Sequence, residues 1–257
     1  MPCPRDASDL PSTMKTTTVT KAVILAAGRG TRMKELTEDC PKPMLPVAGK
    51  PMLAHVVEGM ETAGIEEALI VIGYRGDLVT DHFAAHPPKR LKLSYVRQEK
   101  QDGTGSAARL GRDFAGASPV LMTFGDILVD PATYRSMFAL MGGADAVLAV
   151  KHVDDPHQGA AVYTDGALIT RIVEKPPLGT SSTNWINAGI YCVGPRIFDE
   201  LDRIPLSPRG EYELTDAIHQ MLQAGDRFRW HPIQGFWRDV GRPEDLPVAE
   251  EYVGGEG

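Results

Sequence analysis

Residues 21–33 read KAVILAAGRGTRM, and this stretch decides the fold. Residues 22–27 form a continuous apolar run, which is typical of a strand that is buried on both faces in a parallel sheet. Glycines at positions 28 and 30 end the run, so the chain is expected to turn there. In an open α/β sheet, the loop after a strand lies at the carboxyl edge, where ligands bind. The stretch therefore predicts a buried first strand followed by a ligand-binding turn.

Helical and strand-like patterns alternate after this strand. Strand-like runs are found at residues 68–72, 91–96 and 119–124, and helical patterns at 51–64, 77–85 and 104–114. Such alternation predicts right-handed βαβ units. We therefore expect an α/β protein with a Rossmann-like, doubly wound, mostly parallel mixed sheet and helices on both faces.

The rhythm of the sequence changes after residue 144. Strand-like runs at 146–150, 160–163, 168–173 and 185–193 are followed by helical patterns at 196–202 and 213–223, strands at 228–233 and 236–240, and a helix near 243–252. We interpret residues 21–257 as a single domain of two halves, 21–143 and 144–257, that share one sheet. Residues 1–20 are polar and contain three prolines, so we expect a disordered extension, and Met14 is an alternative start.

Composition excludes several classes of protein. The 257 residues include 27 Lys+Arg against 34 Asp+Glu, a net charge of −7, which argues against a nucleic-acid-binding surface. The three cysteines are far apart and form no CxxC pair, which argues against a zinc site or a disulfide framework and fits a reducing cytoplasm. No apolar run reaches the ~18 residues of a membrane span.

The glycine turn has three interpretations. A dinucleotide fingerprint requires a third glycine where Met33 stands, and the P-loop pattern is absent. A phosphate-binding turn remains open, because glycine amides can approach phosphate oxygens and Arg32 adds a bidentate donor. A purely structural turn also remains open.

Further motifs follow in order along the chain. They are PKPMLPV (41–47), GKPM (49–52), Gln98 with GTG (103–105), GD (125–126), VEKP (173–176), NAG (187–189) and WRDVG (237–241). Together with residues 26–33 they resemble the motifs of the sugar-1-phosphate nucleotidylyltransferases, over roughly residues 21–252. The family includes thymidylyl-, guanylyl- and uridylyltransferases that make nucleotide sugars.

The resemblance implies an enzyme that joins a nucleoside triphosphate to a sugar 1-phosphate and releases pyrophosphate. A phosphate oxygen of the sugar attacks the α-phosphorus in line, assisted by Mg²⁺, so positioning and charge neutralisation matter most. The implied partners are the triphosphate and the sugar phosphate, with no nucleic acid or membrane. A cytoplasmic enzyme is expected, and a homo-oligomer is expected by analogy.

The resemblance also implies roles for individual residues. The catalytic residues would be Arg32, Lys42, Asp126 and Lys175. The nucleotide would be bound by Leu25, Ala27, Gly28, Gly30, Thr31, Arg32, Gln98, Gln101, Gly103, Thr104 and Asp126. The sugar phosphate would be bound by Gly159, Glu174, Lys175 and Asn187, and the metal by Asp126 and Asp239.

The residues themselves support parts of this assignment. Asp126 and Asp239 each follow an apolar strand, and Mg²⁺ is typically held by one or two carboxylates plus phosphates, although Asp after a strand also caps turns. Lys42 lies between two prolines that restrict its backbone. A glutamine amide at Gln98 carries a donor and an acceptor, which suits the imide edge of uracil or thymine and favours UTP or dTTP.

Two other functions are left open by the sequence. One is nucleotidyl transfer, for example from CTP, to a non-sugar phosphate or phosphonate acceptor, because the shape of the acceptor pocket cannot be derived from sequence. The other is a non-catalytic sensor of nucleotide sugars, against which the intact Lys42, Asp126, Lys175 and Asp239 argue.

Overall fold

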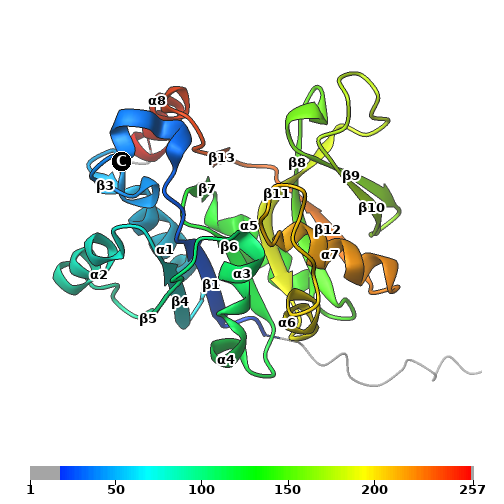
Figure 1. The fold of residues 1–257 in the computed structure, drawn as a ribbon, viewed down its shortest axis with the longest axis horizontal. Helices are drawn as coiled ribbons and strands as arrows, with labels where there is room; N and C mark the ends of the chain where they lie inside the picture. The colour runs from blue at the N-terminus through cyan, green and yellow to red at the C-terminus, as the bar shows by residue number, and fades with distance from the viewer. Residues whose placement is uncertain (1–17, 256–257) are drawn as a thin grey trace, which may run out of the picture.

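The computed structural model describes residues 18–255, so most of the expected extension 1–20 lies outside the described residues. The main sheet consists of β1 (Lys21–Ala26), β4 (Glu67–Ile72), β5 (Lys92–Arg97), β6 (Val120–Phe124), β8 (Ala146–His152), β9 (Ala160–Asp165), β10 (Leu168–Glu174), β11 (Trp185–Val193) and β12 (Phe228–Pro232). Their spatial order is β5–β4–β1–β6–β11–β8–β12–β10–β9. Both halves of the chain therefore contribute to one sheet (Figure 1).

Strand direction differs between the two sides of this sheet. β5, β4, β1 and β6 are parallel neighbours, as βαβ units require. β11 runs antiparallel to both β6 and β8, and β10 runs antiparallel to β12 and β9. The doubly wound α/β class predicted from the sequence is confirmed, but the sheet is evenly mixed rather than mostly parallel, because four of its neighbouring pairs are parallel and four are antiparallel.

Helices cover both faces of the sheet. One face carries α1 (Met52–Ala63), α2 (Gly76–Ala85), α5 (Pro131–Leu140) and α8 (Leu246–Gly254), and the other carries α3 (Thr104–Arg109), α4 (Arg112–Ala115), α6 (Arg196–Leu201) and α7 (Leu214–Gln223). The run 22–27 is apolar throughout because its side chains enter hydrophobic cores on both faces of the sheet. Ala22, Ile24 and Ala26 enter the core under the first group of helices, and the second core contains Val23, Leu25 and Ala27. A central strand between two helical layers needs apolar residues in both directions.

Short elements complete the fold around the carboxyl ends of the first strands. They are η1 (Thr31–Thr37), η2 (Lys42–Met44), β2 (Pro46–Val47) with β3 (Lys50–Pro51), β7 (Ile127–Val129) with β13 (Trp237–Asp239), η3 (Pro156–Gln158) and η4 (Pro243–Asp245). Figure 1 shows β13 crossing from the second half toward α8 beside these loops. The chain's C-terminal part thus returns to the edge where β1 and β6 end.

Some predicted elements are corrected by the structure. The helix expected at 104–114 is interrupted, because the chain reorients at Leu110 and Gly111. A Cβ on Gly111 would lie 2.9 Å from Val23 Cγ2, so this glycine packs directly on β1. Helix α5 and strand β7 were not predicted, although Asp130 caps α5 by accepting a hydrogen bond from the Ala132 N–H (2.8 Å) and Pro131 follows it. Among the described residues, no helix could span a membrane.

The core makes one stability prediction. Leu121 on β6 is fully buried between β1 and β11. Leu121→Ala should lower the free energy of unfolding by about 2–5 kcal/mol, because it leaves a cavity that the sheet cannot close. Leu110→Ala, at a position that is 37% exposed, should cost less than about 1 kcal/mol. Urea denaturation measures both, and equal losses would contradict the assignment of β6 to the core.

Candidate active site

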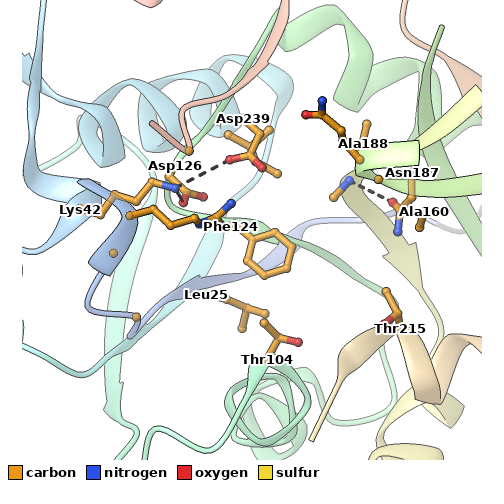
Figure 2. Close-up of a pocket in the computed structure, with 18 of the residues that line it drawn as sticks. Leu25, Lys42, Thr104, Phe124, Asp126, Ala160, Asn187, Ala188, Thr215 and Asp239 are labelled. Atoms are coloured by element: carbon orange, nitrogen blue, oxygen red, sulfur yellow. Dashed lines mark hydrogen bonds and ion pairs between the residues drawn. The ribbon is translucent and has the colours of Figure 1, made fainter. Parts of the chain in front are cut away.

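A cavity of about 1300 Å³ opens at the carboxyl ends of β1 and β6 and extends across β11 toward β9 and β10. Figure 2 shows Lys42, Asp126 and Asp239 on one side of it, Asn187 and Ala160 on the other, and Leu25, Phe124 and Thr104 between them. Both halves of the chain line this one cavity. Of the residues expected from the sequence, those that line it are Leu25, Ala27, Gly28, Gly30, Arg32, Lys42, Gln98, Gln101, Gly103, Thr104, Asp126, Gly159, Glu174, Lys175, Asn187 and Asp239.

The glycine turn after β1 forms one wall of the cavity. Gly30 has φ 70° and ψ 38°, in the left-handed region that favours glycine. A Cβ on Gly30 would lie 2.5 Å from Lys42 Cβ, so the lysine packs directly against the turn. Thr31 then begins η1, and Met33 is buried in the core where a dinucleotide fingerprint needs a glycine. The glycine at position 30 therefore lets Lys42 approach the backbone of the turn closely, but the turn is not the dinucleotide motif.

Lys42 lies between two carboxylates. Its Nζ is 2.5 Å from Asp126 Oδ2 and 3.8 Å from Asp239 Oδ1, and its side chain is only 7% exposed. The two acids meet beside the β7–β13 pair. Asp239 of β13 is paired with Ile127 of β7, Asp126 directly precedes β7, and the Val240 N–H donates to the Asp126 carbonyl (3.1 Å). The carboxyl groups of residues 126 and 239 are thus brought together from distant parts of the sequence.

The charges around these carboxylates are incompletely balanced. Loss of solvation inside the cavity raises the pKa of Asp239, and the nearby charge of Asp126 raises it further, while Lys42 and Arg32 oppose the shift. The single positive charge of Lys42 thus lies beside two carboxyl groups. A pair of carboxylates beside a glycine turn matches the donor set that Mg²⁺ takes in phosphate sites, where phosphates and waters complete the shell. Among the residues described, no cluster of three or more His, Cys, Asp or Glu could hold a metal ion by itself.

Gln98 and Gly103 form the end of the cavity beside α3. The buried Gln98 side chain donates from Nε2 to the Gly103 carbonyl (3.0 Å) and to Ser106 Oγ (2.7 Å). A carbonyl only accepts hydrogen bonds, so the amide nitrogen must lie on this side and Oε1 is the group left as an acceptor. The sequence could not give this orientation, which depends on Ser106.

A segment that the sequence analysis did not single out holds this end in place. Tyr212 donates its N–H to the Asp102 carbonyl and accepts from the Gly105 N–H, both at 2.7 Å. A Cβ on Gly103, where φ is 120°, would lie 2.2 Å from the Tyr212 carbonyl oxygen. Glu211 and Thr215 from the same segment line the cavity. No local pattern distinguishes it from an ordinary helix start, because its partners lie about a hundred residues earlier.

The opposite end of the cavity contains Glu174, Lys175 and Asn187. Lys175 has φ 41° and its N–H donates to the Gly159 carbonyl (2.9 Å). The Asn187 amide is held by the protein on both sides, since Nδ2 donates to the buried Tyr191 hydroxyl (2.8 Å) and Oδ1 accepts from the Gly189 N–H (3.0 Å). Asn187 is therefore fixed in orientation at the cavity wall, and Tyr191 beside it also lines the cavity.

Asp155 and His157 also line this end and were not predicted. Asp155 Oδ1 accepts from the His157 N–H (2.9 Å) and lies 3.2 Å from the ring Nδ1, and Oδ2 accepts from the Gly179 N–H (2.8 Å). These backbone donors lower the pKa of Asp155. An ionised carboxylate at Nδ1 favours the tautomer with a proton there. Only the Asp-x-His spacing in residues 155–157 could have pointed to this pair.

Comparison with known proteins follows the same boundaries as the fold. The family model described as nucleotidyl transferase matches residues 21–254. The chain is 35% identical over 233 residues to the bifunctional protein GlmU of Methanocaldococcus jannaschii, covering 90% of this chain and 54% of GlmU. It therefore spans about half the length of that relative. It is 32% identical to the UTP–glucose-1-phosphate uridylyltransferase AglF of Haloferax volcanii, covering 91% of this chain and 96% of AglF.

Solved structures agree with the fold. A UDP-glucose pyrophosphorylase complexed with UDP-glucose superposes with a TM-score of 0.85 at 24% identity, over 93% of this chain and 100% of that one. A putative glucose-1-phosphate thymidylyltransferase from Bacillus anthracis superposes with a TM-score of 0.79 at 28% identity, over 90% of this chain and 94% of that one. With a family model that matches nearly all of the described residues and a relative matched almost end to end, this chain belongs to the nucleotidyl transferase family.

Proposed function

We propose that this chain transfers a nucleotidyl group from a nucleoside triphosphate to a sugar 1-phosphate and releases pyrophosphate. The observation that carries the proposal is Lys42, held between Asp126 and Asp239 at the centre of a cavity that both halves line. Residues 21–143 would bind the triphosphate and residues 144–257 the sugar phosphate. AglF and the thymidylyltransferase are relatives whose names carry this type of reaction.

The proposed reaction breaks one phosphate bond and forms another. A phosphate oxygen of the acceptor attacks the α-phosphorus, and the bond from that phosphorus to the oxygen bridging the β-phosphorus breaks, so pyrophosphate leaves with the electron pair. Lys42 stabilises negative charge on the α-phosphoryl oxygens. Asp126 and Asp239 would hold Mg²⁺, which when bound would neutralise the crowded phosphate oxygens. Arg32 and the turn amides orient the triphosphate.

The base preference follows from the fixed Gln98 amide. With Nε2 bound to Gly103 and Ser106, Oε1 is left to accept a hydrogen bond. Uracil and thymine carry N3–H at their imide edge, whereas cytosine carries an unprotonated N3 that would face this oxygen. A mismatch of this kind leaves buried polar atoms unpaired. This supports UTP or dTTP as the donor and disfavours CTP.

The direct test is pyrophosphate release from a matrix of UTP, dTTP, GTP, CTP and ATP against a panel of sugar 1-phosphates and non-sugar phosphates, with Mg²⁺. We expect turnover with a sugar 1-phosphate and UTP or dTTP, at least about 10-fold faster than with CTP because of the unpaired acceptor. Turnover only with a non-sugar acceptor would show that the acceptor is a non-sugar phosphate and not a sugar 1-phosphate. No release with any pair, together with tight binding of a nucleotide sugar, would establish a sensor instead.

Removal of either proposed metal carboxylate should slow the reaction. Asp126→Asn and Asp239→Asn should each lower kcat by about 100-fold or more, because charge stabilisation at the phosphoryl group is lost. Chelation of divalent ions should abolish wild-type turnover, and added Mg²⁺ should restore it. Asp130→Asn is the matched control, since Asp130 caps α5 outside the cavity and Asn caps equally well. Equal losses at Asp126 and Asp130 would count against the metal assignment.

Lys175 should act on the acceptor alone. Lys175 forms no ion pair among the described residues, and it lines the end of the cavity beside Gly159 and Asn187. Lys175→Gln should raise the KM of the sugar 1-phosphate by about 10-fold, because one charge-assisted hydrogen bond to phosphate is lost. The KM of the triphosphate should stay within about 2-fold. Lys151→Gln, whose Nζ donates to the Gly235 carbonyl outside the cavity (3.1 Å), should change neither constant.

A further inference from the structure

The basic side chains of the cavity fall into two groups. Three are paired with carboxylates of the chain, and these are Lys42, Arg238 with Asp245 (2.5 Å) and Arg242 with Glu244 (3.8 Å). In the part of the chain that the structure describes, three others line the cavity without an ion pair, and these are Arg29, Arg32 and Lys175. Lys175 lies at the sugar end, whereas the two arginines both belong to the glycine turn. Two guanidinium groups without an ion pair, on one turn of an acidic protein, point to an anion with more than one phosphate.

Arg29 is held on one side of the turn. Its Cζ lies 4.6 Å from the centre of the Tyr74 ring, a cation–π distance. Tyr74 is itself fixed at two points, since its hydroxyl donates to the Glu38 carbonyl and its N–H donates to the Ala27 carbonyl (3.3 Å). The tyrosine thus attaches to the chain on both sides of the glycine turn. Arg29 is consequently directed toward the loop between β4 and α2.

Arg32 is directed to the other side. A Cβ on Gly241 would lie 3.8 Å from Arg32 Nη1 and 3.7 Å from Asp239 Oδ1, so this guanidinium lies against the loop after β13. The two arginines therefore flank the turn, with Arg32 near the carboxylates and Arg29 away from them.

A triphosphate laid along the turn would meet these groups in sequence. Its α-phosphate belongs beside Lys42, Asp126 and Asp239, where bond exchange takes place under the proposed function. The terminal phosphate then lies farthest from the carboxylates, which is the side that Arg29 occupies. A guanidinium stacked on an aromatic ring keeps its in-plane N–H groups available, and these suit two oxygens of one phosphate.

We propose that Arg29, held by the Tyr74 ring, binds the terminal phosphate of the triphosphate and, after transfer, one end of the pyrophosphate. The proposal rests on the proposed function for the identity of the donor substrate. It assigns Arg29 to the leaving group, distinct from Arg32 beside the metal carboxylates and from Lys175 at the acceptor. Tyr74 is a positioning residue that acts through Arg29.

The first test compares KM values in both directions of the reaction. Arg29→Gln should raise the KM of the triphosphate by about 10-fold and, in the reverse reaction, the KM of pyrophosphate by a similar factor. The KM values of the sugar 1-phosphate and of the nucleotide sugar should stay within about 2-fold of wild type. Equal increases for all four substrates would overturn the assignment.

Arg75→Gln is the matched control. Arg75 follows Tyr74, carries the same charge, and is accompanied by Asp39 (3.9 Å) and Asp77 (3.6 Å) outside the cavity. It should leave every KM near the wild-type value. Tyr74→Leu, which removes the ring, should raise the triphosphate and pyrophosphate KM partway toward Arg29→Gln. An Arg29→Gln effect no larger than that of Arg75→Gln would overturn the proposal.

A binding measurement separates this proposal from the proposed function. Calorimetry with UTP and UDP in the absence of acceptor should show tighter binding of UTP by wild type, with the UTP/UDP affinity ratio reduced by about 10-fold in Arg29→Gln. This ratio requires no turnover, so it can be obtained even if the acceptor class is wrong. A ratio unchanged by Arg29→Gln, or equal to one in wild type, would overturn the role of Arg29 while leaving nucleotidyl transfer to be judged by pyrophosphate release.

Discussion

The placement of Lys42 between Asp126 and Asp239 is the interaction on which the rest of the site depends. Two neighbouring carboxylates repel each other inside a cavity, and a cation that lies between them reduces this repulsion. Several independent features enforce this arrangement. Pro41 and Pro43 flank the lysine, Gly30 has no side chain to displace it, and the pairing of β7 with β13 fixes the distance between the acids. The Trp237 indole N–H also donates to the Ala188 carbonyl (2.9 Å), which ties β13 to β11 across the cavity.

The distribution of charge along the cavity follows from this centre. The Lys42 charge is already balanced by carboxylates, so it adds little net attraction for an anionic ligand. The basic side chains without an ion pair lie at the two ends of the cavity. Arg29 and Arg32 stand at the end formed by the glycine turn, and Lys175 stands at the opposite end beside Gly159 and Asn187. On the proposed function, the arginines would attract the triphosphate and Lys175 would attract the sugar phosphate. The two reacting phosphates would then meet beside Lys42 and the two carboxylates, where the protein itself carries no net positive charge. A divalent ion at Asp126 and Asp239 would supply the missing positive charge at that point.

Features with a local cause could be predicted from the sequence. The apolar run 22–27 faces two helical layers, so the continuous apolar pattern correctly predicted a buried strand. The glycines at positions 28 and 30 predicted the turn that follows it. Asp126 was predicted at a ligand-binding edge because it directly follows β6. The orientation of Gln98, the Asp155–His157 pair and the Asn187–Tyr191 hydrogen bond were not predicted, because each depends on which way a side chain turns in the folded cavity. Strand β7 was missed because three residues carry no periodic signal and its partner β13 lies more than a hundred residues away.

Two glycines of the sequence motifs are required by contacts with residues that lie far away in the sequence. Gly103 is required because the Tyr212 carbonyl oxygen would lie 2.2 Å from its Cβ, and Gly30 because Lys42 would lie 2.5 Å from its Cβ. Neither neighbour is adjacent in the chain, so no local rule demands glycine at these positions. Arg29 lies between the two glycines of the turn, and the ring that orients it belongs to the next βα loop. The glycines of the motif therefore reflect backbone contacts that the fold imposes, whereas the side chain between them is free to be oriented by a residue from another loop.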